Sequence, residues 1–420
     1  MQRILVITPE YPYPPEQGAS LRNFYILLGL AGRYDVTLLS ATKDEKLGLA
    51  VDDSPLTDAC QTIRVVHVPD RSPAKRLSRL LTRRSPDMAH RFQDSAFEET
   101  LIEVLSDKSG GLVDPRQFDI AQIEGIELAQ AMPIIRRCSQ ETRIVYDAHN
   151  AETDLQRSAF HTDLASVSRW PGAAYSYVQT RRLDRYEAWA CQTADDVTAV
   201  SDSDADCLSK YRQGQPPTVI PNCIDLRDYE ASPTSSTKSF DILFTGKMDY
   251  RPNVDAVLWF ADEIWPRILE KRPETSWAIV GQKPHSRLEG LRTSPGITIT
   301  GYVDRVQPYL AGAGVVVLPL RMGSGTRLKL LEALASSKPV VSTTLGAEGY
   351  PGVGEAGVTI VNDPEQFASS VLSLLNNRAR RQELGTTGRA FAHNYDWRRV
   401  IPMFDGVYDA LLMKGKSKAS

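Results

Sequence analysis

The chain has 420 residues, more than one hydrophobic core usually supports, and this length predicts two domains. Hydrophobic residues make up 42% of it and charged residues 24%, which excludes a fibrous or disordered chain, and the formal net charge of −3 gives no overall attraction for nucleic acid. Scattered cysteines without C-x-x-C spacing speak against a zinc site or a disulfide framework, and the short apolar run at the start is below signal-peptide length, so we expect a cytosolic protein.

The start of the chain predicts one strand–helix–strand unit. Strand Arg3–Thr8 leads through a proline-rich loop into an amphipathic helix over Ser20–Gly32, and Val36–Ser40 forms the next strand. Further strand-like runs, rich in valine and isoleucine and separated by helical stretches, lie at 118–124, 143–150, 195–201 and 217–222. This alternation is typical of a parallel sheet that helices cover on both faces.

A change of composition divides the chain at residues 225–239, DLRDYEASPTSSTKS, which we interpret as a linker. Beyond it the alternation restarts, with strand-like runs at 240–246, 276–281, 297–303, 315–320 and 339–343. The sequence therefore predicts two doubly wound α/β domains, over residues 1–224 and 240–396. An amphipathic helix that Pro402 should kink follows at 397–420 and ends in a disordered tail.

Residues 315–343 place a short glycine loop between a strand and a helix. Gly323 and Gly325 leave room for a ligand to approach backbone N–H groups. The helix predicted to begin near Thr326 would direct its unpaired N–H groups and its positive dipole end at the same spot. Because ligands of open α/β sheets bind at the carboxyl ends of the strands, this loop is the first candidate site.

Charged side chains on this helix indicate the kind of ligand. Helical spacing places Gly325, Lys329 and Glu332 on one face, so Lys329 would bring positive charge to a phosphate and Glu332 would accept hydrogen bonds from ribose hydroxyls. Arg327 points elsewhere, although a first-turn side chain can bend back. The pattern predicts a nucleoside diphosphate site and matches neither a P-loop nor G-x-G-x-x-G. The alternative is a helix with ordinary exposed charges.

A family resemblance begins at this segment. The retaining family 4 glycosyltransferases of GT-B fold, and their bacterial exopolysaccharide-type members in particular, have a donor-binding signature similar to GSGTRLKLLEALASSKPVVSTTLGAEG. The resemblance extends to TPEYPYPPEQGASLRN, IVYDAHNAET, VIPNCID, FTGKMDYRPNVDAVLWF and GYV, and it weakens between Thr42 and Pro115. It implies two Rossmann-like domains facing across a cleft, the first on the acceptor side and the second binding the donor, with the C-terminal helix crossing back to the first.

The resemblance also implies a site for each part of the donor. Glu332 would bind the ribose, Lys247 and Lys329 the diphosphate, and Gly18 would face the phosphates from the loop after the first strand. His149 would lie beside the donor sugar. The implied donor-binding residues are Gly18, Lys247, Tyr302, Val303, Gly323, Ser324, Gly325, Thr326, Arg327, Lys329 and Glu332, with the backbone of 302–303 edging the nucleobase. The implied catalytic residues are His149, Lys247 and Lys329.

Two positions depart from the family pattern. Ser324 stands where the family usually has its first glutamate, and Asn253 stands where a second phosphate-binding lysine is expected. Lys329 and Arg327 are candidates to supply the missing charge. Each implied residue also has an ordinary alternative; His149, for example, is by default a hydrogen-bonded core histidine.

The implied reaction moves a sugar from a nucleoside diphosphate sugar to an acceptor hydroxyl, with retention at the anomeric carbon and without a metal or other cofactor. The acceptor would be lipid-linked, a polysaccharide precursor or a small-molecule glycan. Two alternatives stay open. One is a sugar-nucleotide epimerase of the same fold, and the other is a catalytically inactive subunit that binds sugar nucleotides, for which Ser324 is the argument.

A basic run at Arg71–Phe92, RSPAKRLSRLLTRRSPDMAHRF, carries a small apolar face and almost no acid. Such a helix can lie on an anionic membrane surface. Because the family often glycosylates lipid-linked acceptors, we expect peripheral binding at the inner face of the cell membrane. A solvated surface is the alternative. Nothing in the sequence favours nucleic acid as a partner.

Overall fold

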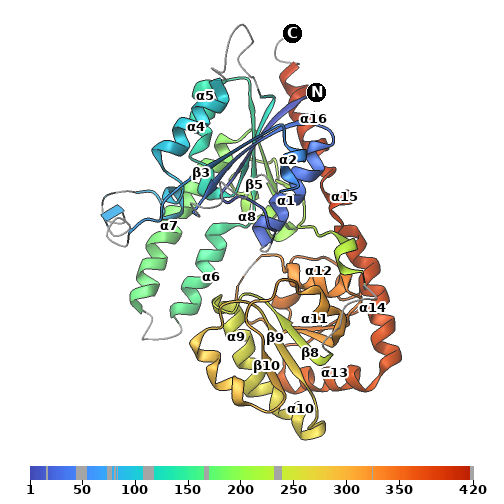
Figure 1. Cartoon of the computed structure of the whole chain (residues 1–420). Coiled ribbons are helices and arrows are strands. Elements are labelled where there is room, and N and C mark those ends of the chain that lie inside the picture. The colour runs from blue at the N-terminus through green and yellow to red at the C-terminus, as the bar shows by residue number, and fades with distance from the viewer. Residues whose placement is uncertain are drawn as a thin grey trace. The chain divides into compact units, whose positions relative to one another are not determined.

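The computed structural model describes residues 1–15, 18–43, 54–72, 78–79, 82, 84–106, 118–164, 170–230, 239–323 and 325–416 (Figure 1). The chain forms two compact units. The N-terminal unit contains Met1–Cys223 together with Trp397–Ser420, and the C-terminal unit contains Ile224–Asp396. None of the helices within the described ranges has both the length and the apolar character that a membrane crossing requires.

A parallel sheet in the order β3-β2-β1-β4-β5-β6-β7 forms the centre of the N-terminal unit. Its strands are β1 (Arg3–Thr8), β2 (Asp35–Thr42), β3 (Thr62–His67), β4 (Ile120–Glu124), β5 (Arg143–Ala148), β6 (Asp196–Ala199) and β7 (Thr218–Val219). The strand order reverses between β1 and β4. The loops that follow these strands therefore diverge at the carboxyl edge, which is where open α/β sheets bind ligands.

Helices cover both faces of this sheet. The α-helices are α1 (Gly18–Ala31), α2 (Leu56–Ala59), α4 (Ser95–Ser106), α5 (Ala131–Cys138), α6 (Glu152–Leu164), α7 (Trp170–Thr193), α8 (Asp202–Ser209), α15 (Trp397–Val400) and α16 (Met403–Lys416), and the 3₁₀ turns are η2 (Met88–His90) and η3 (Ile126–Leu128). Ile4 packs with α1 and α16 on one face, whereas Leu5 packs with α4 and α7 on the other. Successive strand residues point to opposite faces, so a sheet covered twice needs a continuous apolar run.

The C-terminal unit has a second parallel sheet, in the order β10-β9-β8-β11-β12-β13. Its strands are β8 (Phe240–Thr245), β9 (Trp277–Val280), β10 (Ile297–Ile299), β11 (Ala313–Leu318), β12 (Val340–Ser342) and β13 (Val358–Ile360). Its helices are α9 (Arg251–Trp259), the π-helical turn η6 (Phe260–Ile264), α10 (Trp265–Lys271), α11 (Gln307–Gly312), α12 (Leu328–Ala335), α13 (Pro364–Asn376) and α14 (Arg378–Ala392), with 3₁₀ turns η5 (Leu226–Tyr229), η7 (Ser286–Thr293), η8 (Leu345–Ala347) and η9 (His393–Tyr395).

Differences from the sequence-based elements lie at helix starts and sheet edges. The first helix begins at Gly18 rather than Ser20, and the helix after the glycine loop begins at Leu328 rather than near Thr326, because Arg327 has a non-helical backbone (φ −101°, ψ 87°). Strands β3 and β13, at one edge of each sheet, were not predicted; most of their residues are only partly buried or exposed, so their apolar signal is weak. The predicted break at Pro402 is confirmed between α15 and α16.

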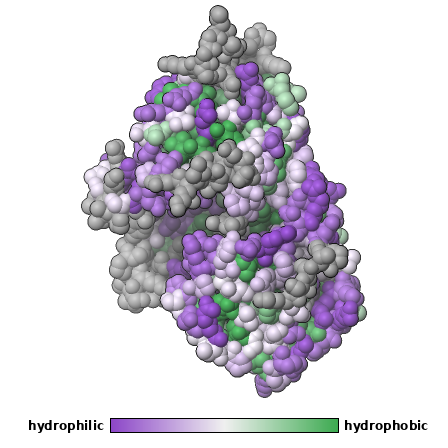
Figure 2. Space-filling model, viewed as in Figure 1, coloured by the Kyte–Doolittle hydropathy of each residue, from purple (hydrophilic) through white to green (hydrophobic). Residues whose placement is uncertain are grey.

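The stretch interpreted as a linker is partly ordered. Its start forms η5, in which Asp225 caps the turn by accepting from the Arg227 backbone N–H at 2.9 Å, and Leu226 and Tyr229 are buried. Residues 231–238 lie outside the described part of the chain. Figure 2 shows hydrophilic residues over most of the described surface in view, with hydrophobic residues in smaller groups.

Candidate functional site

The glycine loop follows β11 at the carboxyl edge of the C-terminal sheet. Gly323 and Gly325 have φ angles of 102° and 85°, in the left-handed region that glycine adopts without strain, and Ser324 between them lies outside the described residues. Thr326 packs against the loop after β12, where a Cβ added to Gly349 would lie 2.6 Å from Thr326 Cγ2. A second loop therefore holds the glycine loop where it enters α12.

Lys329 occupies the first turn of α12 and is half-buried. Its Nζ donates to Asn253 Oδ1 at 2.8 Å and lies 4.5 Å from the centre of the Phe244 ring. Burial lowers the pKa of Lys329 to about 7, and the charge of Arg327 adds to this effect. Among the described residues no carboxylate forms an ion pair of 4.0 Å or less with this ammonium group. An anionic ligand would supply a negative counter-charge for Lys329.

Asn253 positions this lysine. While its Oδ1 accepts from Lys329, its Nδ2 donates to the backbone oxygen of Lys247 at 2.9 Å. A Cβ added to Gly246 would lie 2.7 Å from both Asn253 Nδ2 and Lys329 Nζ, so the contact requires glycine there. From the sequence, Asn253 is interpreted only as the replacement of an expected phosphate-binding lysine. Its role as a bridge joins residues far apart in the chain, and no local pattern indicates it.

Glu332 lies one turn after Lys329 on α12, as the helical spacing predicts. Its Oε1 accepts from the Tyr229 hydroxyl at 3.0 Å. Burial raises the pKa of Glu332, and Tyr229 and Lys329 partly oppose this rise. Tyr229 belongs to the stretch interpreted as a linker, so the sequence missed it. The i, i+3 spacing of Leu226 and Tyr229 is the one signal that could have indicated a packed turn.

The remaining implied donor residues of this unit lie beyond the carboxyl ends of two other strands of the same sheet. Lys247 follows β8; its side chain is 38% exposed, and its Nζ lies 3.9 Å from Asp249 Oδ1. Tyr302 and Val303 follow β10, and Tyr302 is 57% exposed. All three share the sheet edge that carries the glycine loop, because parallel strands end at the same edge.

Arg327 is 9% exposed and lies beside the glycine loop. A Cβ added to Gly323 would lie 3.3 Å from its Nη2. Burial lowers the pKa of Arg327, whereas the charge of Glu348 raises it. The Arg327 guanidinium therefore lies beside the backbone of the glycine loop, and the negative charge of Glu348 attracts it.

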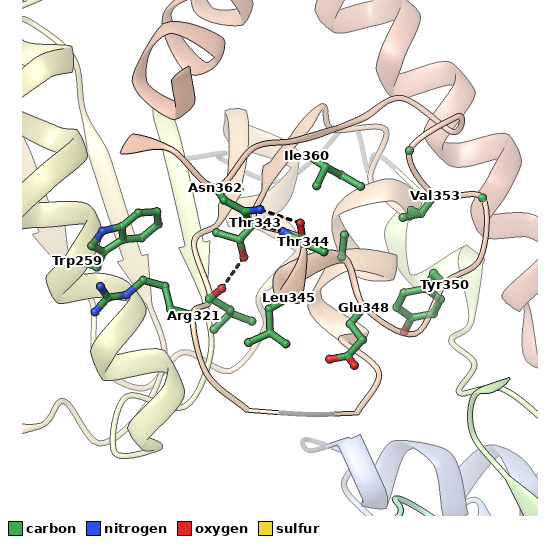
Figure 3. Close-up of a pocket in the computed structure, with 14 residues that line it drawn as sticks. Trp259, Arg321, Thr343, Thr344, Leu345, Glu348, Tyr350, Val353, Ile360 and Asn362 are labelled. Atoms are coloured by element: carbon green, nitrogen blue, oxygen red, sulfur yellow. Dashed lines mark hydrogen bonds between the residues drawn. The ribbon is translucent and has the colours of Figure 1, made fainter. Parts of the chain in front are cut away.

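A cavity of about 710 Å³ adjoins this loop on the side of β12 and β13. Figure 3 shows Trp259 and Arg321 on one side of it and Tyr350 and Val353 on the other. Arg321 is engaged, because its guanidinium pairs with Asp255 through contacts of 2.9 and 3.1 Å and lies over the Trp259 ring. The cavity thus has an apolar wall, and its Arg321 is already paired with a carboxylate. Neither feature suits a phosphate ligand.

In the N-terminal unit, His149 directly follows β5 and is bound to a buried carboxylate. Its Nε2 lies 2.8 Å from Glu124 Oε2, at the end of β4. Burial and the nearby Asp147 charge raise the pKa of Glu124 to about 7. Although burial would lower the pKa of His149, the Glu124 carboxylate raises it above its ordinary value. Nε2 is thus occupied, and within the described part of the chain Nδ1 remains for a further partner.

Asp147 forms the second buried pair of this cluster. Its carboxylate accepts from Arg22 Nε at 2.8 Å and Nη2 at 2.9 Å, and from Thr198 Oγ1 at 2.5 Å. Burial alone would raise the pKa of Asp147, but the Arg22 charge and these hydrogen bonds lower it to about 2. Arg22 comes from α1 and also donates to the Ile220 oxygen, so it joins the helix to the sheet.

Glu124, Asp147 and His149 offer one ligand atom each, all within 4.8 Å of one another. Such a group could in principle hold a metal ion. Here Arg22 occupies both oxygens of Asp147 and His149 occupies Glu124, and the guanidinium charge would repel a cation. The donor set fits a hydrogen-bonded charge network better than a metal centre.

Two other implied features belong to this unit. Gly18 is the exposed first residue of α1, near the carboxyl end of β1. In the basic run, Arg71 pairs with Asp87 through contacts of 3.0 and 3.1 Å, and Phe92 is buried. Residues 73–77, 80–81 and 83 of that run lie outside the described part, so its membrane binding stays a prediction.

Models of two known families match this chain. One, described as Glycosyltransferase Family 4, matches residues 17–228, which is half of the chain. The other, described as Glycosyl transferases group 1, matches residues 239–377. The chain belongs to glycosyltransferase family 4. This assignment agrees with the resemblance found at the glycine loop.

Curated relatives of this family 4 protein match only part of it. An uncharacterized 44.6 kDa protein in the cps region of Klebsiella pneumoniae is 25% identical over 170 residues, which are 38% of this chain and 44% of that protein. A sulfoquinovosyl transferase of Arabidopsis thaliana is 30% identical over 146 residues, or 32% of this chain and 28% of that protein. The chain thus spans less than half the length of these relatives.

Solved structures resemble the family 4 protein over nearly its full length. Sucrose-phosphate synthase from Thermosynechococcus elongatus has a TM-score of 0.68 at 17% identity, covering 99% of this chain and all of that one. Anabaena HepE in complex with UDP and glucose has a TM-score of 0.63 at 13% identity, covering 98% of this chain and all of that one. At such identities the likeness shows the fold, which is GT-B, as the sequence predicted.

Proposed function

We propose that this protein transfers a sugar from a nucleoside diphosphate sugar to an acceptor hydroxyl, with retention at the anomeric carbon. The observation that carries this proposal is Lys329, a half-buried ammonium group that forms no ion pair with a described carboxylate, at the start of α12 and one turn before Glu332. A diphosphate beside Lys329 and a ribose beside Glu332 would satisfy both side chains with one ligand.

Leaving-group stabilisation is the chemistry that this arrangement supplies. Breaking the bond between sugar and phosphate develops negative charge on the departing diphosphate. Lys329, Lys247 and the N–H groups at the start of α12 are fixed positive groups for that charge, and such preorganised donors need little rearrangement during reaction. Asn253 and Phe244 hold the Lys329 ammonium in place.

Retention by front-face attack agrees with the burial and the hydrogen bonds of the carboxylates near His149. A double displacement would require a carboxylate free to attack the sugar. Glu124 and Asp147 are fully buried and engaged with His149 and Arg22, so neither is suited to that role. We therefore propose that the leaving phosphate oxygen takes the proton of the acceptor hydroxyl, and that His149 Nδ1 bonds to the donor sugar.

The donor and acceptor follow from the comparisons as proposals. HepE structures contain UDP, UDP and glucose, or UDP-glucose, so a UDP-hexose is the first donor to try. The Klebsiella relative lies in a cps region, which favours a lipid-linked or polysaccharide-precursor acceptor. We propose that no resident metal takes part, because Lys247, Lys329 and the N–H groups at the start of α12 would supply the positive charge that the diphosphate needs.

The test is a thermal-shift screen with UDP, GDP, ADP and TDP and their sugars, followed by donor hydrolysis and transfer assays. A ligand at 100 times its dissociation constant should add about 2.7 kcal/mol to the free energy of unfolding. EDTA should leave that shift unchanged. Strict dependence of binding on Mg²⁺ would contradict the metal-free proposal.

The second candidate function is an inactive subunit that binds sugar nucleotides, which Ser324 favours. Tight binding without transfer or slow hydrolysis would support it. We propose an active enzyme, because a negative charge at this position would oppose the departing diphosphate and a serine hydroxyl can still bond to an oxygen of the donor. Ser324→Ala should cost about 1 kcal/mol in transition-state stabilisation. Release of free nucleotide and sugar without acceptor, with inverted sugar stereochemistry, would instead indicate an epimerase.

A further inference from the structure

A second cavity, of about 390 Å³, lies at the opposite edge of the C-terminal sheet from the glycine loop. It is bordered by the first residues of β8 and β11 and by Pro339, which precedes β12. We call it the amino-edge pocket. Because the strands are parallel, their amino ends meet at this edge and their carboxyl ends, with Lys329 and Glu332, at the other. The pocket is therefore separate from the candidate donor site.

Four basic side chains from three separate segments border the amino-edge pocket. Arg272 follows α10, Lys338 lies in the turn between α12 and β12, and Arg378 and Arg381 lie in the first turn of α14. Asp241 is the one carboxylate among the residues described as lining it. Asp241 Oδ1 pairs with Arg272 Nη2 at 3.1 Å, so that cation is neutralised.

The other three cations keep their charge. Lys338 Nζ donates to the Ala311 backbone oxygen at 2.7 Å, and Arg381 Nη1 donates to the oxygens of Leu374 and Leu375 at 2.7 and 2.6 Å. Carbonyl oxygens satisfy hydrogen-bond donors but cancel no net charge. Among the described residues no carboxylate pairs with Lys338, Arg378 or Arg381 within 4.0 Å.

Backbone packing fixes the positions of these groups. A Cβ added to Gly385 of α14 would lie 2.2 Å from the Ser337 oxygen, so α14 abuts the turn that carries Lys338. Burial and the charge of Arg381 lower the pKa of Lys338, which reflects how closely the cations are held together. A site that keeps like charges together without a counter-charge gains most from a ligand that supplies one.

We propose that the amino-edge pocket binds a phosphate-bearing anion. Guanidinium groups bind phosphate oxygens through paired hydrogen bonds, and a lysine adds a point charge. The volume falls in the range of small-ligand sites, roughly 300–1,000 Å³. The phosphate belongs either to a small soluble molecule or to a phospholipid headgroup. Binding experiments with each kind of ligand distinguish the two sources.

The test measures pyrophosphate binding by calorimetry at about 0.15 M salt. All chains carry Lys329→Ala, which is expected to weaken diphosphate binding at the candidate donor site. Arg378→Glu is compared with Arg380→Glu, because Arg380 lies in the same exposed helical turn, pairs with Glu383 and does not line the pocket. The two variants change net charge equally. Arg378→Glu should weaken binding roughly tenfold or more, whereas Arg380→Glu should leave it within about threefold.

The lipid source is tested by cosedimentation of the same variants with vesicles of anionic phospholipid and of phosphatidylcholine. Loss of anionic-vesicle binding in Arg378→Glu alone would assign the pocket to a headgroup, and loss of pyrophosphate binding alone would assign it to a soluble ligand. Equal effects of the two variants on both ligands, or no binding of either ligand by the parent chain, would overturn the proposal. These binding measurements test the amino-edge pocket whether or not the protein transfers sugar.

Discussion

His149 Nε2 lies 2.8 Å from Glu124 Oε2, and this carboxylate has no exposure to solvent. Gln122 Nε2 donates to the other oxygen of Glu124 at 2.5 Å, and the Tyr408 hydroxyl of α16 donates to Gln122. A buried chain of hydrogen bonds thus runs from the C-terminal helix to the histidine implied beside the donor sugar. Glu124 is a positioning residue, because it acts through His149.

The first prediction concerns Glu124→Gln. The amide keeps a hydrogen-bond acceptor but removes the negative charge that raises the pKa of His149, so that pKa should fall. Proton NMR titration of the His149 ring reports it, with His149→Gln to assign the signal among the six histidines. The pH profile of donor turnover should move the same way. An unchanged His149 titration would show that Glu124 is merely structural.

The second prediction concerns the buried pair of Arg22 and Asp147. Asp147→Asn leaves a buried guanidinium without its counter-charge and should lower the free energy of unfolding by about 3–5 kcal/mol. Thr198→Val, which removes a neutral donor to the same carboxylate, should cost only about 1–2 kcal/mol. Denaturant unfolding measures both.

The acid stability of the same pair has a definite direction. The pKa of Asp147 is about 2 in the folded protein, below its ordinary value of 3.8, so the pair's stabilisation is present above about pH 4 and is lost as pH falls toward 2. Asp147→Asn should show a smaller loss across this interval than the parent. Parallel acid curves for the two chains would contradict the assignment.

The third prediction concerns the pH dependence of nucleoside diphosphate binding. Lys329 has a pKa of about 7 in the free protein, and a diphosphate beside it favours the ammonium form. Binding at pH 8 should therefore take up most of a proton, and affinity should fall by more than about tenfold between pH 7 and pH 9. The terminal phosphate is already ionised there, since its pKa is about 6.

Calorimetry in buffers of different ionisation enthalpy counts this proton. Lys329→Arg is the matched control, because a guanidinium stays protonated throughout. Its affinity should be nearly flat over the same pH range. Equal slopes for lysine and arginine would assign the titration to another group.

The fourth prediction separates the ribose and diphosphate contacts. Glu332→Ala should weaken UDP binding by roughly 1.5–3 kcal/mol, because the ribose hydroxyls lose a charged acceptor, and should not weaken pyrophosphate binding, which involves no ribose. Tyr229→Phe removes the 3.0 Å hydrogen bond to Glu332 and should have a smaller effect of the same kind. A loss of UDP and pyrophosphate binding in equal measure would place Glu332 at the phosphates instead.

The fifth prediction concerns Asn253, the residue that bridges Lys329 and the Lys247 backbone. Asn253→Ala frees the ammonium group, so pyrophosphate and UDP affinity should fall together, by roughly tenfold. Asn253→Asp would neutralise Lys329 and should weaken binding further. If Asn253→Ala bound both ligands as tightly as the parent, the bridge would have no part in placing the lysine.

Local sequence patterns were sufficient to predict the two α/β units and the loop that bears the candidate site. Apolar runs alternating with helical stretches predicted nearly every central strand, because a strand covered on both faces must be apolar throughout. The glycine loop with Lys329 and Glu332 could also be predicted from local sequence. Glycine permits the left-handed turn, and helical spacing sets which side chains share a face.

The hydrogen-bond partners of these side chains could not be predicted from local sequence, because they come from distant parts of the chain. Asn253 reaches Lys329 across 76 residues, Tyr229 reaches Glu332 across 103, and Glu124 reaches His149 across 25. None of these pairs lies at helical or strand spacing. Their distances depend on which strands are neighbours in the sheet and on how helices pack over them, and so do the pKa values that burial and neighbouring charges set. A local pattern places a residue on an element, whereas the packing of elements selects its partner.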